Sequence, residues 1–223
     1  MKKASVFKRL FDVFFSSLGI ILLIPFALVI AIMILIDSKG PVLYLQSRIG
    51  KDKLSFYLLK FRTMFTDSDT KGYLTLGQGD SRITSVGYWL RRIKLDELPQ
   101  LLNVLKGDMS LVGPRPEVKT YVDLYSKQQQ KVLTVRPGIT DWASVKFRNE
   151  NELIVMADNP EAYYIEKIMP AKLKMNLEYI ERMNPWIDFK IILLTLFPFL
   201  KSKSIKNMEN KIDIKPSTNI SKT

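Results

Sequence analysis

The chain has 223 residues and a formal net charge of +12, from 34 lysines and arginines against 22 aspartates and glutamates. This length allows one domain with a sizeable core, or such a domain plus a membrane element, but is short for two ordinary domains. The sequence contains no histidine and no cysteine, which excludes Ser-His-Asp and Cys-His nucleophiles, His/Cys zinc sites and disulfide scaffolds. Catalysis must therefore use carboxylates, lysine, tyrosine or hydroxyls, with an oxygen-ligated ion such as Mg²⁺ if a metal takes part.

A long apolar segment lies near the N-terminus. From Val13 to Ile36 the chain runs for 24 residues without a charge, which as a helix is about 36 Å long and could cross a hydrocarbon core. Bulky aliphatic residues continue to the end of the segment, whereas the shorter apolar region of a signal peptide ends in small residues. Basic residues flank both ends, and Pro25 lies in the middle.

Two topologies are open for this segment. Because positive charge lies on both flanks, the positive-inside bias does not favour placing the two ends on opposite faces of the membrane. Pro25 removes a backbone hydrogen bond and predicts a kink. These features favour a re-entrant helix, which enters one leaflet and returns to the same face, over a kinked helix that spans the bilayer.

The region that follows mixes short strands with helices. Val42–Leu45 and Phe56–Leu59 have the β-branched and aromatic bias of strands, and Gly50–Asp52 predicts a turn between them. Leucines at i, i+3, i+4 and i+7 predict a helix, and they are Leu98, Leu101, Leu102 and Leu105. Further helices are predicted over residues 117–133 and 160–183. The predicted fold class is α/β, mainly α.

The C-terminal part contains a second apolar stretch and a basic tail. Trp186–Leu200 is interrupted by charged residues and a proline, so it predicts an interfacial or core helix rather than a span, with Trp186 at the water boundary. Residues 201–223 carry six lysines against two acidic residues. We expect this tail to be disordered.

The most informative stretch is Arg91–Gln100. Pro99 suits a first helical turn, so Asp96 and Glu97 lie at or just before the N-terminus of the leucine-faced helix. The unpaired amides there favour anions, which suits both an ionised carboxylate and a phosphate. An acidic residue at a helix start is commonplace, but here three basic residues precede the pair within five positions.

A second stretch, Gly107–Glu117, holds Arg115 between Pro114 and Pro116. The two prolines predict a stiff turn, and the fork of a guanidinium suits bidentate binding of phosphate or carboxylate. A structural ion pair and a ligand contact both fit this arginine.

Together these stretches resemble the bacterial sugar transferase family, the monotopic phosphoglycosyl transferases. The resemblance rests on five motifs in order, Lys60–Met64, Asp80–Thr84, Leu95–Leu101, Asn103–Glu117 and Arg136–Thr140. The apolar N-terminus and the segment that begins at Trp186 are also placed as in that family. The resemblance covers about residues 5 to 200, and several ordered motifs are more specific than any one of them.

The resemblance implies an activity. Members transfer a sugar 1-phosphate from a nucleoside diphosphate sugar, usually UDP-linked, to undecaprenyl phosphate at the cytoplasmic face of the bacterial inner membrane. They start an O-antigen, capsule, exopolysaccharide or glycoprotein glycan. The implied partners are a UDP-sugar, undecaprenyl phosphate and membrane lipids, with no nucleic acid.

The resemblance also implies a domain organisation. The family's membrane element is described as a re-entrant helix broken near a proline. Residues 1–38 would form this helix, residues 39–200 a cytoplasmic-face catalytic domain with interfacial amphipathic helices, and residues 201–223 the basic tail.

The family's functional residues map onto this chain. Asp96 would be the nucleophile that forms an aspartyl phosphosugar and releases UMP, and the lipid phosphate would then displace it. Mg²⁺ near Asp96 would offset the phosphate charge. Glu97 would be the dyad partner, placing the metal or handling a proton. The implied substrate-binding residues are Arg91, Arg115, Lys60 and Arg62.

One departure from the family pattern concerns the substrate. After Ile139 and Thr140 the family continues with Gly-Trp-Ala-Gln, whereas this chain has Asp141-Trp142-Ala143-Ser144. The dyad is unaffected, so the departure leaves the chemistry intact and the sugar unassigned.

Two rival functions differ in class. Asp67–Asp69 has the DxD spacing of a metal-dependent glycosyltransferase, although this spacing is frequent by chance and lies in a polar stretch. The positive charge alone would also fit a non-catalytic basic module that binds nucleic acid or anionic lipid at a membrane surface.

Overall fold

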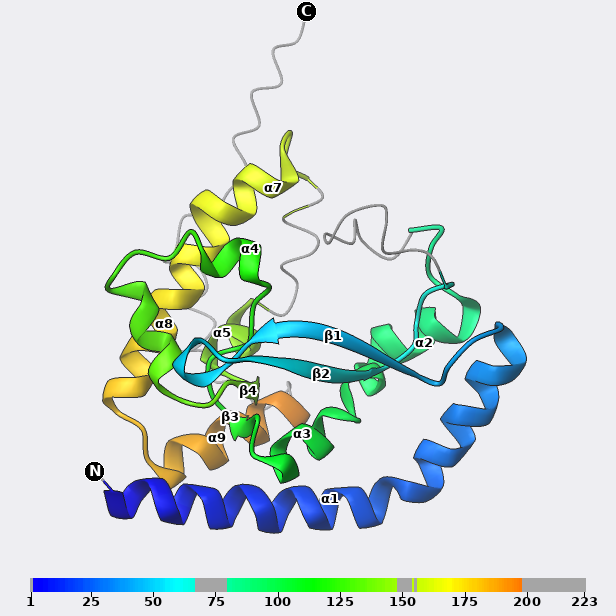
Figure 1. Cartoon of the computed structure of the whole chain (residues 1–223), viewed down its shortest axis with the longest axis horizontal. Coiled ribbons are helices and arrows are strands. Elements are labelled where there is room, and N and C mark those ends of the chain that lie inside the picture. The colour runs from blue at the N-terminus through cyan, green and yellow to red at the C-terminus, as the bar shows by residue number, and fades with distance from the viewer. Residues whose placement is uncertain (1, 67–79, 148–153, 155, 198–223) are drawn as a thin grey trace, which may run out of the picture.

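The computed structural model describes residues 2–66, 80–147, 154 and 156–197. Helices dominate, and the strands form two small sheets (Figure 1). The predicted class, α/β and mainly α, is confirmed. The rival DxD motif at 67–69 and the predicted tail at 201–223 lie outside the described residues.

Helix α1 (Lys2–Asp37) forms the N-terminal element and contains Pro25. It bends part-way along its length into two arms that run along two adjacent sides of the molecule (Figure 1), as expected from a proline that breaks the hydrogen-bond ladder. Among the described residues it is the one helix long and apolar enough to cross a membrane, and only 11% of its apolar window is buried. Most of its side chains therefore face away from the domain.

The predicted hairpin is confirmed. Strands β1 (Leu43–Ile49) and β2 (Ser55–Phe61) pair antiparallel, with Gln46 opposite Leu58. A one-turn 3-10 helix, η1 (Lys51–Lys53), joins them. Leu59 and Phe61 are buried on one face of β2, and Leu58 is buried on the other, so the second half of this strand is covered on both faces and Lys60 shares a face with Leu58.

A second sheet escaped prediction because each of its strands has three residues. Strands β3 (Ser110–Val112) and β4 (Gly138–Thr140) pair in parallel. A Cβ atom at Gly138 would lie 2.1 Å from the backbone nitrogen of Gly113, so the two backbones can cross only with glycine there. The close approach of the two backbones places the turn that carries Arg115 next to β4.

Short helices follow the hairpin. They are α2 (Ser85–Ile93), the 3-10 turn η3 (Leu95–Glu97), α3 (Gln100–Lys106), α4 (Lys119–Val122), the 3-10 helix η4 (Gln129–Thr134) and α5 (Trp142–Lys146).

The prediction of one helix over 117–133 is wrong in its middle. The backbone N–H of Ser126 donates to Oε1 of Gln129 (2.8 Å), and the N–H of Gln129 donates to Oγ of Ser126 (3.3 Å). This reciprocal capping box starts a new turn at Ser126 and separates α4 from η4.

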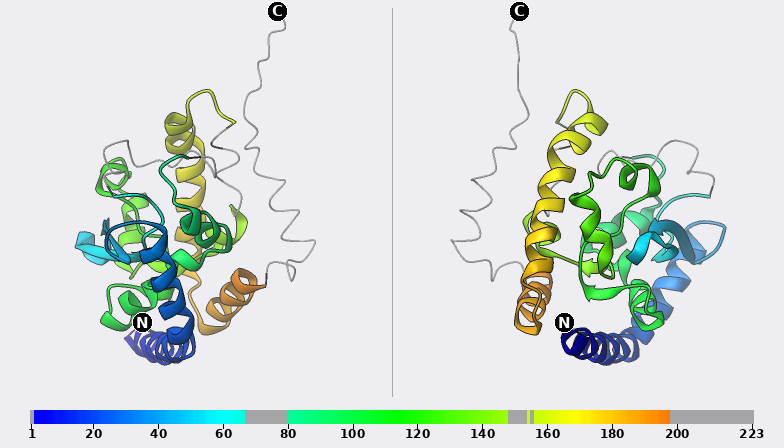
Figure 2. Two further views of the ribbon diagram at one scale, coloured as in Figure 1. Left: turned by 90° about the vertical axis from the view of Figure 1, so that its right-hand side faces the viewer. Right: turned by 60° about the vertical axis from the view of Figure 1, so that its left-hand side comes forward.

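The predicted helix over 160–183 is confirmed as α7 (Pro160–Tyr163), the π-helical turn η5 (Tyr164–Ile168) and α8 (Met169–Glu181), which follow one another without a break. The predicted C-terminal helix is α9 (Pro185–Leu196), as far as the chain is described. Figure 2 shows α8 standing along one side of the molecule, and α9 begins close to the N-terminal end of α1.

Buried clusters join these elements. The largest packs α8 and η5 against α4 and η4. A second joins α9 to β3 and α5, a third joins β2 to α3, and a fourth joins the C-terminal arm of α1 to β2 and α2. Helix α1 is therefore part of the core at its C-terminal arm.

Candidate active site

Asp96 and Glu97 lie in η3, between α2 and α3. Lys94 ends α2 in the left-handed region, with φ of 59°, so the chain turns sharply before the dyad. Pro99 is the N-cap residue of α3. The dyad thus occupies the position that the sequence predicts, in a tight turn just before the leucine-faced helix.

Glu97 is the centre of an ion-pair cluster. Its Oε2 accepts a hydrogen bond from Nη1 of Arg115 (3.2 Å), its Oε1 pairs with Nη2 of the same guanidinium, and Nζ of Lys60 lies 3.4 Å from Oε1. Burial alone would raise the pKa of Glu97, but Arg115 and Lys60 together outweigh it, so the pKa falls well below its usual range. Glu97 is therefore ionised and held by two cations from separate elements.

Asp96 has a different environment. Within the described parts of the chain its carboxylate forms no hydrogen bond and no ion pair. Partial burial and the neighbouring charge of Glu97 raise its pKa, although Lys60, Arg91 and Arg115 act in the opposite direction. Asp96 is therefore the member of the dyad whose oxygens remain available to a ligand.

Arg91 lies in the last turn of α2. Burial lowers its pKa, and the charges of Asp96 and Asp80 oppose that shift. Asp80 is bound by the fork of Arg82, with Nε to Oδ1 at 2.9 Å and Nη2 to Oδ2 at 2.6 Å. These hydrogen bonds lower the pKa of Asp80 to about 2. Arg91 thus lies within electrostatic range of the dyad and of this pair.

Arg62 lies elsewhere. Its guanidinium donates to the carbonyl oxygens of Ser38 (2.6 Å), Ile34 (3.3 Å) and Lys39 at the C-terminal end of α1. Such contacts satisfy the last carbonyls of a helix and complement its dipole. The structure therefore brings Lys60 and Arg115 to Glu97 and leaves Arg62 as a helix cap. Its contacts give no support to the substrate-binding role predicted for it.

A further residue supports the turn that carries Arg115. Asp141 is fully buried, and its Oδ2 accepts the backbone N–H of Arg115 (3.3 Å) while its Oδ1 accepts the N–H of Ser144 (2.6 Å). The second bond caps α5. Sequence reasoning noted Asp141 only as a departure from a pattern. The Asp-x-x-Ser spacing signals the cap but not the contact with Arg115.

The other side of the same turn is held by Glu117. Its carboxylate pairs with Arg48 (3.2 Å) and accepts a hydrogen bond from the hydroxyl of Tyr164. Arg48 also donates to the carbonyl oxygen of Pro116. The turn is thus fixed from both ends, so Arg115 is preorganised before any substrate binds.

The dyad fits a magnesium ion that is shared with a substrate. No group of three or more acidic side chains that could hold a metal occurs in the described ranges. Mg²⁺ usually takes only one or two protein carboxylates and completes its shell with water and substrate phosphates. Asp96 offers an unshared carboxylate whose pKa is raised first by burial and then by the charge of Glu97, and a bound cation would stabilise its ionised form.

Comparison with known proteins decides the family. Residues 3–202 match the sequence model of the family described as bacterial sugar transferase. The chain belongs to this family.

Relatives in the bacterial sugar transferase family differ in the sugar that they name. An undecaprenyl-phosphate glucose phosphotransferase of Komagataeibacter xylinus is 38% identical over 85% of this chain and 35% of its own length. A UDP-N-acetylgalactosamine-undecaprenyl-phosphate N-acetylgalactosaminephosphotransferase of Aeromonas hydrophila is 37% identical over 85% of this chain and 42% of its own. The chain thus spans well under half of these two relatives.

A third relative is similar in length to this chain. The uncharacterized sugar transferase EpsL of Bacillus subtilis is 37% identical over 90% of this chain and 91% of its own length. The similarity therefore extends over nearly the whole length of a protein of comparable size.

Proposed function

We propose that the protein transfers a sugar 1-phosphate from a UDP-sugar to undecaprenyl phosphate and so initiates a glycan, such as an O-antigen, capsule, exopolysaccharide or glycoprotein glycan. The observation that carries the proposal is the pairing of an unshared carboxylate, Asp96, with a carboxylate that two cations hold, Glu97. Membership in the bacterial sugar transferase family favours this enzyme over a non-catalytic basic module.

The reaction runs in two displacements at the sugar-side phosphorus. An Asp96 oxygen attacks this phosphorus, the bond from it to the bridging oxygen breaks, and UMP leaves with that oxygen. The enzyme then holds an aspartyl phosphosugar. An oxygen of undecaprenyl phosphate attacks the same phosphorus and releases the Asp96 carboxylate, which yields a lipid diphosphate sugar. Neither step requires a histidine, which this chain lacks.

The cations around the dyad bind and orient the diphosphate. Arg115 is held by Glu97 through its guanidinium and by Asp141 through its backbone, so its fork is placed before the substrate arrives. Lys60 and Arg91 add positive charge near Asp96, which reduces the repulsion between an anionic nucleophile and a phosphate. Magnesium bound at Asp96 would supply further charge neutralisation for the phosphoryl oxygens.

The contacts of the two arms of α1 with the rest of the protein support a re-entrant topology. In its N-terminal arm, Lys8 pairs with Asp188 of α9 at 2.6 Å, and Arg9 donates to carbonyl oxygens at the end of α3. In its C-terminal arm, Ile34 is buried against the domain, and the helix end is bound by Arg62. Since both arms contact one domain, both ends would lie on the same side of the membrane. We place that domain at the cytoplasmic face of the bacterial inner membrane.

A tag at the N-terminus tests this topology. In inverted and right-side-out vesicles, a membrane-impermeant label should reach the N-terminal tag and a C-terminal tag from the same face. Labelling of the two tags from opposite faces would show that the helix spans the bilayer.

The covalent step is tested by trapping. Purified protein with a UDP-sugar and Mg²⁺, but without lipid acceptor, should release UMP in about one equivalent and gain the mass of a phosphosugar on the peptide that contains Asp96. Asp96→Asn should do neither. Asp123→Asn is the matched control, because this aspartate forms an exposed ion pair with Lys119. Full UMP release by Asp96→Asn would refute the proposal. A panel of UDP-sugars in the same assay identifies the donor.

A further inference from the structure

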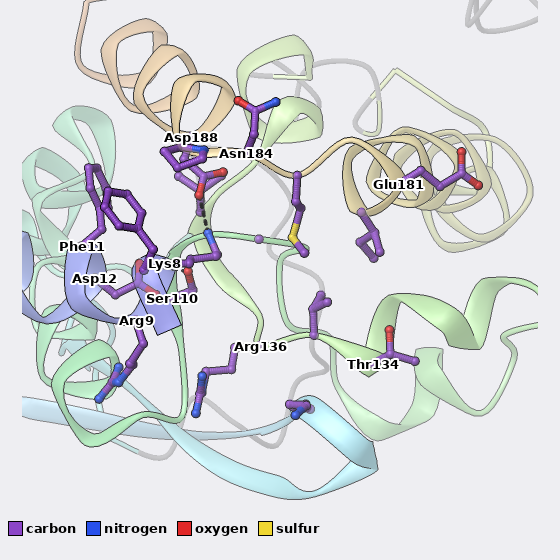
Figure 3. Close-up of a pocket in the computed structure, with 18 residues that line it drawn as sticks. Lys8, Arg9, Phe11, Asp12, Ser110, Thr134, Arg136, Glu181, Asn184 and Asp188 are labelled. Atoms are coloured by element: carbon purple, nitrogen blue, oxygen red, sulfur yellow. Dashed lines mark hydrogen bonds and ion pairs between the residues drawn. The ribbon is translucent and has the colours of Figure 1, made fainter. Parts of the chain in front are cut away.

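A cavity of about 740 Å³ lies at the N-terminal end of α1 (Figure 3). Its walls come from the first turns of α1, the turn between α8 and α9, the end of β3 and the segment 134–136. None of the six residues predicted for catalysis or substrate binding lines it. Its volume is that of a small-molecule site, so the cavity is large enough for a ligand of its own.

The walls are mainly apolar and continue onto the surface of the membrane helix. Phe7 and Phe11 line the cavity from α1, and Met183 lines it from the α8–α9 turn. Phe7 is 56% exposed, and its neighbours on the outer surface of the same helix, Leu10 and Phe14, are 64% and 62% exposed. A hydrocarbon chain that contacts α1 could therefore enter the cavity without crossing a polar barrier.

Most charged groups at the cavity are already satisfied by the protein. Lys8 pairs with Asp188 (2.6 Å), Asp12 accepts two hydrogen bonds from β3 (3.0 Å each), and Arg9 donates to two carbonyl oxygens at the end of α3 (2.6 and 2.8 Å). These groups anchor α1 to the domain. They leave no net charge for a ligand.

Arg136 differs from these groups. Its Nε donates to the carbonyl oxygen of Gly107 (2.7 Å), but neither of its Nη atoms has a hydrogen-bond or ion-pair partner among the described residues. Lys51 adds a second, half-exposed cation at the rim, where its Nζ lies 3.6 Å from Oδ2 of the exposed Asp52. The carboxylate of Glu181 points away from the cavity (Figure 3). A guanidinium with two free donors beside an apolar wall suits a phosphate that carries a hydrocarbon body.

We propose that this cavity binds an anionic membrane phospholipid, with its phosphate on Arg136 and Lys51 and an acyl chain along Phe7 and Phe11. The site is separate from the dyad and goes beyond the proposed transfer reaction. A bound lipid would join the N-terminal arm of α1 to the 134–136 segment and the α8–α9 turn, three elements that otherwise meet around an empty volume.

The test uses the full chain in detergent micelles that contain equal amounts of phosphatidylglycerol and phosphatidylcholine. Native mass spectrometry should show phosphatidylglycerol retained about tenfold more than phosphatidylcholine. Arg136→Gln should abolish this preference. The matched control is Arg92→Gln, which removes an exposed arginine from α2 that lies over Trp89 and should keep the preference.

Two further measurements distinguish binding of a whole lipid from binding of its phosphate alone. Millimolar inorganic phosphate should leave phosphatidylglycerol bound if the acyl chain contributes, and Met183→Gln should lower lipid retention severalfold by making the wall polar. If Arg136→Gln does not fold, Arg136→Lys keeps the charge but loses the fork, and should retain an intermediate amount.

Equal retention of both lipids by the wild type, an unchanged preference in Arg136→Gln, or complete displacement by phosphate would overturn the proposal. UMP release in micelles of phosphatidylcholine alone tests the transfer reaction independently, so failure of one proposal is distinguishable from failure of the other.

Discussion

The guanidinium of Arg62, just after β2, donates a hydrogen bond of 2.6 Å to the carbonyl oxygen of Ser38, just after α1. Two more carbonyl oxygens of the same helix end, those of Ile34 and Lys39, accept from the same side chain. Arg62 thus connects the C-terminal end of α1 to the hairpin that carries Lys60.

Arg62→Gln should lower the free energy of unfolding by about 2 to 3 kcal/mol, because several buried carbonyl groups lose a charged donor. The KM for the UDP-sugar should change little. Chemical denaturation in detergent and initial rates of UMP release measure the two quantities, with Arg92→Gln as the exposed control. A raised KM at unchanged stability would restore the substrate-binding interpretation of Arg62.

Arg115→Ala should destabilise the protein most at neutral pH. The pKa of Glu97 in the folded protein lies below its unfolded value, so its interactions stabilise the fold above the unfolded pKa of about 4.3 and this contribution is lost as pH falls. Without Arg115, burial raises the pKa of Glu97 and its ionised form becomes unfavourable.

At pH 7 we expect Arg115→Ala to lower the free energy of unfolding by about 2 kcal/mol, since Lys60 still pairs with Glu97. The deficit should shrink as pH falls through the pKa of Glu97 in the variant, because protonation then removes the unpaired charge. Thermal denaturation between pH 7 and pH 4 measures this trend. Lys119→Ala, which removes an exposed pair with Asp123, should show no such trend, and a deficit that grows toward acid would contradict the assignment.

The fold was predictable where local sequence signals agree. The hairpin follows from β-branched and aromatic runs with a turn between them. The long helix that begins at Pro160 was also predicted, although it contains Pro170 and a π-helical turn at Tyr164–Ile168. The helix over 117–133 failed because Ser126 and Gln129 cap each other, a local contact that hydrophobic periodicity does not register. The pairing of β3 with β4 depends on two distant glycines, Gly113 and Gly138.

The candidate site was predictable where residues lie together in a motif. Asp96, Glu97 and Arg115 came from such motifs, and the structure brings Glu97 and Arg115 into contact. The contacts of Arg62 with the end of α1 could not be predicted, because the carbonyl oxygens that it binds lie 23 to 28 residues earlier in the chain. Asp12 immediately precedes the charge-free run that begins at Val13. Its buried carboxylate accepts two hydrogen bonds from β3, which no local sequence signal indicates.

Asp141→Ser should lower the rate of UMP release about 10- to 100-fold, because serine can cap α5 but is too short to hold the backbone of Arg115. If Asp141 acts through Arg115, the double variant with Arg115→Ala should be no slower than Arg115→Ala alone. A double variant slowed by the product of the two single effects would show that Asp141 acts independently.

Lys8→Met should cost about 3 kcal/mol of stability, because it leaves the buried carboxylate of Asp188 without its cation and with only the hydroxyl of Tyr179. Adding Asp188→Asn should recover much of this loss, since the uncompensated charge is then gone. Denaturation in detergent measures both. Lys190→Met, an exposed change on the same helix, is the control, and a loss there of equal size would argue against a specific pair.

The bend of α1 has a mechanical consequence. If its two arms lie in one leaflet, as proposed, the protein adds volume to that leaflet and none to the other. Bilayer thickness, which matters to a helix that must match both surfaces, would then affect it weakly. Lateral packing of the lipids would affect it strongly, so the protein should partition into curved or loosely packed regions, and the place where a glycan begins would follow the shape of the membrane.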